Sequence, residues 1–373
     1  MSLHITDAFD SGNIIVKSAE DPGDIRLEIR RDTGSDFFQW FHFRVTGAKG
    51  TPLSMTIENA AQAAYLDGWT GYQACASYDR ETWFRIETRY ENGELTLQHD
   101  CELDTVWFAY FAPYSMERHQ DLIAWAQIQN GVELEILGDT LDGRSMDCVT
   151  VGDGDKTIWI TARQHPGESM AEWWVEGFLN RLLDEADPVA RKLKEQAVFH
   201  IVPNMNPDGS FRGHLRTNAK GVNLNREWDK ASPENSPEVY HVLENIRDTG
   251  VNLHLDVHGD EGLPYNFIAG GEGAPNFTPA DQAVLDAYKT ALAAISPDFQ
   301  TAHGYPVNAP GTADLSICTN YMANTFGCLA MTLEMPFKDN ADLPDPVEGW
   351  SPERCRKLGA ANLDAMLSVL NLI

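Results

Sequence analysis

The sequence is poor in basic residues. Its 373 residues include 28 Lys plus Arg against 56 Asp plus Glu, which gives a formal net charge of −28 at pH 7. A protein with this excess of negative charge repels phosphate backbones and anionic lipid headgroups. We therefore expect neither nucleic acid nor a membrane surface among its partners.

Cysteine is also scarce, and the six cysteines form no CxxC pair. This pattern argues against a disulfide-rich secreted scaffold and a cysteine-ligated zinc site, and it predicts reduced thiols in a cytosol. The first residues include Asp7 and Asp10 where a signal peptide would be basic, and no apolar stretch follows them. We therefore predict a cytoplasmic protein.

Residues 315–333 are uncharged, but they contain too many Ser, Thr and Asn side chains to form a membrane span. We interpret them as a loop that leads into a buried strand.

The chain has enough apolar material for two packed domains, since 43% of its residues are hydrophobic and chains of this length usually divide. In the first part, apolar and polar residues alternate, and this period predicts strands at 25–29, 41–45, 53–57, 84–88 and 95–97. Several short, half-buried strands predict an antiparallel β-sandwich over residues 1–113. Pro113 closes a last strand-like run at 105–112, and helical spacing follows from 117 to 129.

Residues 114–373 show a different pattern, in which continuous apolar runs alternate with amphipathic segments. We predict buried strands at 157–162, 198–203, 251–257 and 329–335, and helices at 170–185, 236–247, 279–295 and 352–370. Ser169 and Glu172 have the spacing of a capping box at the start of the first helix. The second part is therefore predicted to be an α/β domain.

Polar residues follow the predicted strands of this domain, where open α/β sheets bind ligands. His165 and Glu168 come after the first strand, and His258 ends the third. Taken alone, His165 and Glu168 are more simply explained as solvated turn residues. A catalytic zinc needs three protein ligands and an open position, however, and His258 completes a usual set of two histidines and a glutamate. His254 lies earlier on the same strand face, where we expect a core histidine or a partner of a ligand.

Glu334 lies inside the most apolar predicted strand, and a buried carboxylate without a partner is costly. Two explanations stay open. Glu334 is either a core glutamate in a salt bridge or a general base beside the metal.

The segment 209–226 is locally basic in an acidic protein. It contains no acidic residue and four basic ones, which are Arg212, Arg216, Lys220 and Arg226. This cationic patch is either a solvated loop or a substrate site. Asn225 next to Arg226 favours an arginine that is held for bidentate binding of a carboxylate.

Four separate segments together match one family. HPGE, NPDG with GHLRTNAKGVNLNREW, DVHG and LEMPF, in this order and at these separations, resemble the zinc metallocarboxypeptidases. The leading sandwich, with FAPYSMERHQDLIAW at the join, is similar to that of the cytosolic carboxypeptidase subfamily. The resemblance covers essentially the whole chain. It implies an N-terminal antiparallel β-sandwich followed by a carboxypeptidase-like α/β domain with a mixed, largely parallel central sheet.

The resemblance also implies a role for each site residue. His165, Glu168 and His258 would hold one Zn²⁺ per chain, Glu334 would be the general base, Asn225 and Arg226 would bind the C-terminal carboxylate of a peptide or protein, and Arg216 would stabilise the oxyanion. Removal of a terminal glutamate, as in eukaryotic members of the subfamily, is compatible with the cationic patch.

The sequence departs from the family pattern at several positions. Asn223 stands where many members have an aspartate that binds a zinc histidine, and Gly167 precedes the glutamate ligand, as in HPGE-type members. The tyrosine that covers the substrate's end has two possible counterparts, Tyr305 and Tyr321.

Two other functions stay open. Acylamino-acid hydrolases that resemble aspartoacylase share the zinc set and the Asn-Arg pair but lack a leading sandwich. A binding protein with an inactive metal site is the third possibility, and a buried base at Glu334 argues against it.

Overall fold

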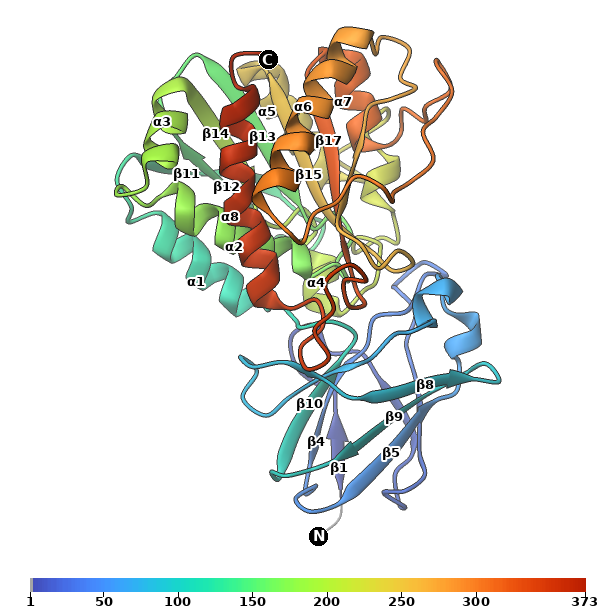
Figure 1. The fold of residues 1–373 in the computed structure, drawn as a ribbon. Coiled ribbons are helices and arrows are strands. Elements are labelled where there is room, and N and C mark those ends of the chain that lie inside the picture. Colours follow the sequence, from blue (N-terminus) through green and yellow to red (C-terminus); the bar gives the residue numbers. More distant parts are fainter. Residues whose placement is uncertain (1–2) are drawn as a thin grey trace.

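The computed structural model describes residues 3–373, whose strands and helices fall into two lobes (Figure 1). The N-terminal lobe contains two five-stranded sheets, with strand orders β1-β4-β10-β6-β7 and β2-β3-β5-β9-β8. Its elements are β1 (His4–Thr6), β2 (Ile15–Ser18), β3 (Ile25–Glu28), β4 (His42–Thr46), β5 (Pro52–Ile57), η1 (Ala60–Gln62), η2 (Leu66–Trp69), β6 (Cys75–Ser77), β7 (Phe84–Arg85), β8 (Glu87–Glu91), β9 (Glu94–Asp100) and β10 (Thr105–Ala109).

Apart from 84–88, the predicted strands of this lobe are confirmed, and Ile25 and Leu27 of β3 point inward as expected and are completely buried. The strand predicted at 84–88 is wrong, because the chain there forms two short strands, β7 and β8, that belong to different sheets. One pairing differs from a purely antiparallel sandwich, because β3 and β5 run parallel. The chain between them passes through β4 in the other sheet and so returns in the same direction.

The C-terminal lobe is built on a seven-stranded sheet of order β11-β12-β14-β13-β15-β17-β16. The strands β14, β13, β15 and β17 are parallel, and the outer pairings are antiparallel. The predicted fold class, a β-sandwich followed by an α/β domain whose mixed sheet is parallel at its centre, is confirmed. The strands are β11 (Val132–Asp139), β12 (Ser145–Val151), β13 (Lys156–Ala162), β14 (Ala197–Val202), β15 (Leu253–Asp260), β16 (Phe267–Gly270) and β17 (Leu329–Pro336).

Helices cover both faces of this sheet (Figure 1). Ile158 and Ile160 of β13 belong to one hydrophobic core with α2, α6 and α8, whereas Trp159 between them belongs to a second core with α5 and α7. The helices are α1 (Met116–Ala126), α2 (Met170–Leu182), α3 (Pro188–Gln196), α4 (Pro207–Arg212), η3 (Leu224–Arg226), α5 (Pro237–Thr249), α6 (Pro279–Ile295), α7 (Cys318–Phe326) and α8 (Pro352–Val369).

Two local predictions for the C-terminal lobe are also wrong. The loop predicted for 315–333 contains α7, which buries Cys318 and Met322 in the second core. The capping box at α2 does not form, because Ser169 Oγ donates to the carbonyl oxygen of Ala112 at 2.9 Å and Glu172 bonds to other buried side chains. In both cases a contact with a distant part of the chain overrides the local pattern.

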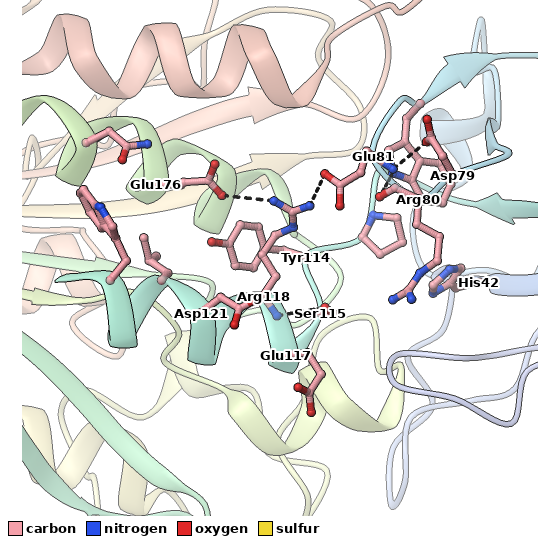
Figure 2. Close-up of a pocket in the computed structure, with 15 residues that line it drawn as sticks. His42, Asp79, Arg80, Glu81, Tyr114, Ser115, Glu117, Arg118, Asp121 and Glu176 are labelled. Atoms are coloured by element: carbon pink, nitrogen blue, oxygen red, sulfur yellow. Dashed lines mark hydrogen bonds and ion pairs between the residues drawn. The ribbon is translucent and has the colours of Figure 1, made fainter. Parts of the chain in front are cut away.

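The sandwich docks against the loops that leave the carboxyl ends of the parallel strands (Figure 1). Arg85 donates to the carbonyl oxygens of Phe337 and Trp350 beyond β17, at 2.9 and 3.0 Å. Elsewhere on the junction, Arg118 of α1 lies between Glu81 of the sandwich and Glu176 of α2, beside a cavity of about 560 Å³ (Figure 2). The strand ends where the sequence predicts a site therefore face the sandwich.

All six cysteines are buried and free. Among residues 3–373, no helix is both long and apolar enough to cross a bilayer.

Candidate active site

The three predicted metal ligands converge in the structure. Glu168 Oε1 lies 2.6 Å from His165 Nδ1, and its Oε2 lies 2.8 Å from His258 Nδ1. The two Nδ1 atoms are 3.2 Å apart. All three side chains are buried, and they are the only cluster of three or more His, Cys, Asp and Glu residues between positions 3 and 373 that is arranged to hold a metal ion.

The hydrogen bonds made by the Nε2 atoms of the two histidines show that this cluster fits a cation. His258 Nε2 lies 2.7 Å from Asp256 Oδ2, and His165 Nε2 lies 3.1 Å from Asn223 Oδ1, which also accepts the amide of Asn225. These oxygens are acceptors, so the ring protons sit on Nε2 and both Nδ1 lone pairs face the centre. Two lone pairs and a carboxylate that point at one another need a positive ion between them, and zinc prefers this donor set.

The turn that carries His165 and Glu168 is held in place by buried charged contacts. Arg163 has a φ of 59°, a conformation rare for a residue with a side chain, and its Nε donates to the carbonyl oxygen of Pro166 at 2.9 Å. Its guanidinium pairs with Glu172, which also bonds to His119 at 2.8 Å. These buried charged contacts fix the backbone that leads into His165.

His254 lies one layer deeper than the cluster. It is completely buried, with its ring edge-on to Trp228, and its Nε2 lies 3.4 Å from the hydroxyl of Thr161. Burial lowers the pKa of His254 to about 4. A neutral core histidine at this position agrees with the expectation from the sequence.

Glu334 lies on β17 directly opposite His258 in the strand register. Its Oε1 is 3.1 Å from the hydroxyl of Tyr305, its buried Oε2 has no hydrogen-bond partner, and it forms no salt bridge with residues 3–373. Burial raises the pKa of Glu334 well above its usual value, and the nearby carboxylates of Glu168 and Asp260 add to this effect. A buried carboxyl group with a raised pKa and one unpaired oxygen is suited to accept a proton and pass it on.

The predicted cationic patch does not exist as one surface. Arg212 makes two hydrogen bonds to Asp142, at 2.9 and 2.7 Å, and Lys220 bonds to Asn235 at 2.7 Å. Only Arg216 and Arg226 line the cleft that contains the metal cluster. The sequence shows that four basic residues are close along the chain, but not that Asp142 and Asn235, from other segments, bind two of them outside the cleft.

Asn225 and Arg226, the pair predicted to bind a carboxylate, both line the cleft. Asn225 Oδ1 accepts the amide of Cys318 at 2.8 Å, which leaves Asn225 Nδ2 for another acceptor. Arg226 NH1 donates to the carbonyl oxygen of Asn225 at 2.5 Å, and no carboxylate of residues 3–373 lies within salt-bridge distance of this guanidinium. Burial and the neighbouring charge of Arg216 lower the pKa of Arg226. An anion beside Arg226 would offset both the burial of its positive charge and the repulsion from Arg216.

The cleft has a volume of about 950 Å³ and contains residues that the sequence did not identify. Tyr305 lies in it, with its hydroxyl 2.6 Å from Asp260 Oδ2, whereas Tyr321 packs against Phe326 and does not line it. The unassigned lining residues include Tyr65, Asp260, Glu261, Glu272 and Lys289. Asp260 and Glu261 directly follow the DVHG motif, which was the one available signal for them.

Comparison with known proteins places this arrangement in a family. The sequence profile of the cytosolic carboxypeptidase N-terminal domain matches residues 5–111, and that of the zinc carboxypeptidases matches residues 122–351. An uncharacterized protein of Zymomonas mobilis is 54% identical over 96% of this chain and 94% of its own length. Mouse cytosolic carboxypeptidase 6 is 30% identical over 70% of this chain, which spans about half (54%) of that longer protein.

A solved structure has the same fold over its full length. The metallo-carboxypeptidase of Pseudomonas aeruginosa, in complex with (2-guanidinoethylmercapto)succinic acid, superposes with a TM-score of 0.97 at 46% identity and 99% coverage of both chains. Together with the matched profiles, this likeness extends over the sandwich as well as the α/β domain. The chain belongs to the zinc carboxypeptidase family of metallopeptidases, and it includes the N-terminal domain of the cytosolic carboxypeptidases.

Proposed function

We propose that this protein is a zinc-dependent carboxypeptidase that removes the C-terminal residue of a peptide or protein, and that it acts in the cytoplasm. The observation that carries the proposal is that one cleft contains three kinds of group. These are a converging set of metal ligands, a buried carboxylate oxygen without a partner, and an arginine without an anion. The aspartoacylase-like alternative is not favoured, because the matched family includes the sandwich.

Each residue then has a definite task. Zn²⁺ held by His165, Glu168 and His258 would supply Lewis acidity to the site. Glu334 accepts a proton from the attacking water at Oε2 and passes it to the leaving nitrogen. Arg216 donates to the carbonyl oxygen as it gains negative charge. Asn225 and Arg226 bind the α-carboxylate, which restricts cleavage to a chain end.

A charged pair in the lining of the cleft bears on which residue is removed. Lys289 Nζ lies 3.5 Å from Glu272 Oε1, and both side chains are largely buried. Lys289 supports the removal of a C-terminal glutamate, because it can bind a side-chain carboxylate there. Glu272 competes for the same cation, so we propose a moderate preference for glutamate over glutamine. The ligand of the Pseudomonas enzyme carries a guanidino group, which makes a basic C-terminal residue the other outcome to test.

Peptides that differ only in the last residue test the proposal directly. We expect mass spectrometry to show loss of single residues from peptides with a free C-terminus and no loss from the same peptides with a C-terminal amide. The assay includes an N-acyl amino acid as the comparison substrate. If the protein hydrolyses that compound and cleaves no peptide, it is an aspartoacylase-like hydrolase and not a carboxypeptidase.

The metal site gives a second expected result. We expect about one zinc per chain by metal analysis of the purified protein, and no zinc in His258→Ala, because the other two ligands alone leave the set incomplete. His254→Ala is the matched control, since His254 lies on the same strand but outside the cluster, and it should keep zinc. A folded wild-type protein that takes up no zinc after dialysis against it would contradict the proposed ligand set.

A further inference from the structure

A carboxylate of the sandwich binds the loop that carries Arg216. Asp32 Oδ1 accepts the amide of Leu215 at 2.7 Å. Asp32 Oδ2 accepts the amides of Arg216 and Thr217, at 2.8 and 2.9 Å, and the hydroxyl of Thr217 at 3.1 Å. One buried side chain therefore satisfies three consecutive backbone amides of a segment that lies more than 180 residues away in the sequence. Because donors surround both of its oxygens, this carboxylate acts only as an acceptor.

The turn that contains Asp32 is fitted closely to the same loop. Thr33 donates its backbone amide to His214 Nε2 at 3.1 Å, and His214 Nδ1 lies 3.0 Å from the carbonyl oxygen of Thr217. Gly34 and Gly221 face each other across the junction with φ of 72° and 84°, and a Cβ on Gly221 would lie 2.5 Å from the carbonyl oxygen of Gly34. The backbones thus approach at a distance that only glycine permits.

The sandwich also supports the guanidinium of Arg216. The Cζ atom of Arg216 lies 5.6 Å from the ring centre of Phe37 and 5.4 Å from that of Tyr65. Tyr65 is fixed by Gln39, whose side-chain amide bonds to both the backbone N–H and the carbonyl oxygen of Tyr65, at 2.9 and 3.0 Å. Both the backbone and the charged end of Arg216 therefore rest on residues 32–65.

A second arginine at the junction shows a different arrangement. Arg118 pairs with carboxylates on both sides, Glu81 and Glu176, as Figure 2 shows. Arg216 makes no ion pair with residues 3–373, although the carboxylates of Glu168, Glu261 and Glu334 help to keep its pKa high despite burial. Arg118 thus joins the lobes, whereas the aromatic rings leave the hydrogen-bond donors of Arg216 available in the cleft.

We propose that Asp32 is a positioning residue for Arg216, so that the sandwich completes the catalytic centre of the α/β domain. This inference rests on the carboxypeptidase function proposed above. Preorganised donors lower a barrier only when they are held where charge develops. The hydrogen bonds of Asp32 fix the backbone from which Arg216 reaches that place.

Asp32→Asn tests this role, because the amide has the same shape but turns one acceptor into a donor that faces other donors. Loss of one oxyanion donor costs about 10²- to 10³-fold in kcat, and Arg216→Ala should show that loss. We expect Asp32→Asn to lower kcat at least about tenfold while KM and zinc content stay within about twofold. The double variant should be no slower than Arg216→Ala alone, because both changes remove the same contribution.

The matched control is Asp10→Asn. Asp10 also accepts a backbone amide across the junction, that of Met116 at 2.5 Å, but it does not line the cleft, so kcat should stay unchanged. If Asp32→Asn fails to fold, Phe37→Leu removes one of the two rings beside Arg216 without touching Asp32 and should lower kcat in the same way. A folded Asp32→Asn with wild-type kcat, or a double variant that shows the product of both losses, would overturn the proposal.

Hydrogen exchange separates this inference from the proposed function. The amides of Leu215, Arg216 and Thr217 should exchange faster in Asp32→Asn than in the wild type, whatever the enzyme cleaves. A wild type without peptidase activity would refute the proposed function, while this exchange still tests the anchoring of the loop. Unchanged exchange would overturn the positioning role even in an active enzyme.

Discussion

Replacing Glu334 by glutamine should leave the fold and the zinc content intact and lower kcat by at least about 100-fold. Transfer of a proton by a positioned base is worth about 10²- to 10⁴-fold, and glutamine cannot accept the proton. The amide can still lie beside the hydroxyl of Tyr305, because Oε1 keeps its place 3.1 Å away. The measurement is kcat at saturating peptide, together with the melting temperature and the zinc content of the variant.

Glu238→Gln is the control for this experiment. Glu238 is a buried glutamate outside the cleft, and like Glu334 it has one carboxylate oxygen without a partner. Burial raises the pKa of Glu238 to about 7, so its replacement imposes a similar change in a similar environment. We expect its kcat to equal that of the wild type. Full turnover by Glu334→Gln would show that Glu334 is only a core residue, and loss of folding would indicate a structural role.

Replacing Arg226 by alanine should lower kcat/KM by orders of magnitude without loss of zinc. Breaking one side of a desolvated arginine–carboxylate pair costs roughly 3 to 5 kcal/mol, which corresponds to about 10²- to 10⁴-fold in kcat/KM. Among residues 3–373, the guanidinium has only a backbone carbonyl as its hydrogen-bond partner, so it remains free to bind a substrate carboxylate, as proposed. Steady-state kinetics on a peptide with a free C-terminus measures the loss.

Two comparisons make the assignment of Arg226 specific. Arg212→Ala removes an arginine of the same segment that is already paired with Asp142, and its effect on kcat/KM should be small. Amidated peptides should be poor substrates of the wild type, and Arg226→Ala should reduce their cleavage little further. If the wild type cleaves amidated and free peptides equally well, Arg226 does not recognise a terminal carboxylate and the enzyme is not an exopeptidase.

The sequence could predict the features that depend on local pattern. Period-two alternation and continuous apolar runs identified the strands, and the end of a parallel strand is where a ligand site is expected. His165, Glu168, His258 and Glu334 lie at such ends, so the structure brings them together as expected. Their catalytic roles, and a domain boundary at residue 114, stay predictions.

Features that depend on partners from distant segments could not be predicted in this way. Ser169 has the sequence pattern of a helix cap, but its hydroxyl donates a hydrogen bond to the carbonyl oxygen of Ala112 instead. Arg212 belongs to the predicted cationic patch, but it pairs with Asp142 from another segment. Nothing in the spacing of residues 29–41 shows that Asp32 reaches the loop of Arg216, because periodicity does not specify which loop of a sandwich meets which loop of a neighbouring domain.

Gly34 and Gly221 restrict how this sequence can change over evolutionary time. Each has a positive φ, and a Cβ would lie 2.5 Å from the backbone of the other lobe at Gly221 and 3.0 Å from it at Gly34. A substitution at either one displaces the segment that carries Arg216, so selection on catalysis would remove it even if the protein remained folded. The two glycines contact each other across the two lobes, so we expect both to be conserved in the same set of related sequences. In a related protein without the sandwich, the position of Gly221 could accept other residues. The arginine that corresponds to Arg216 would then need contacts from other residues to hold it in place.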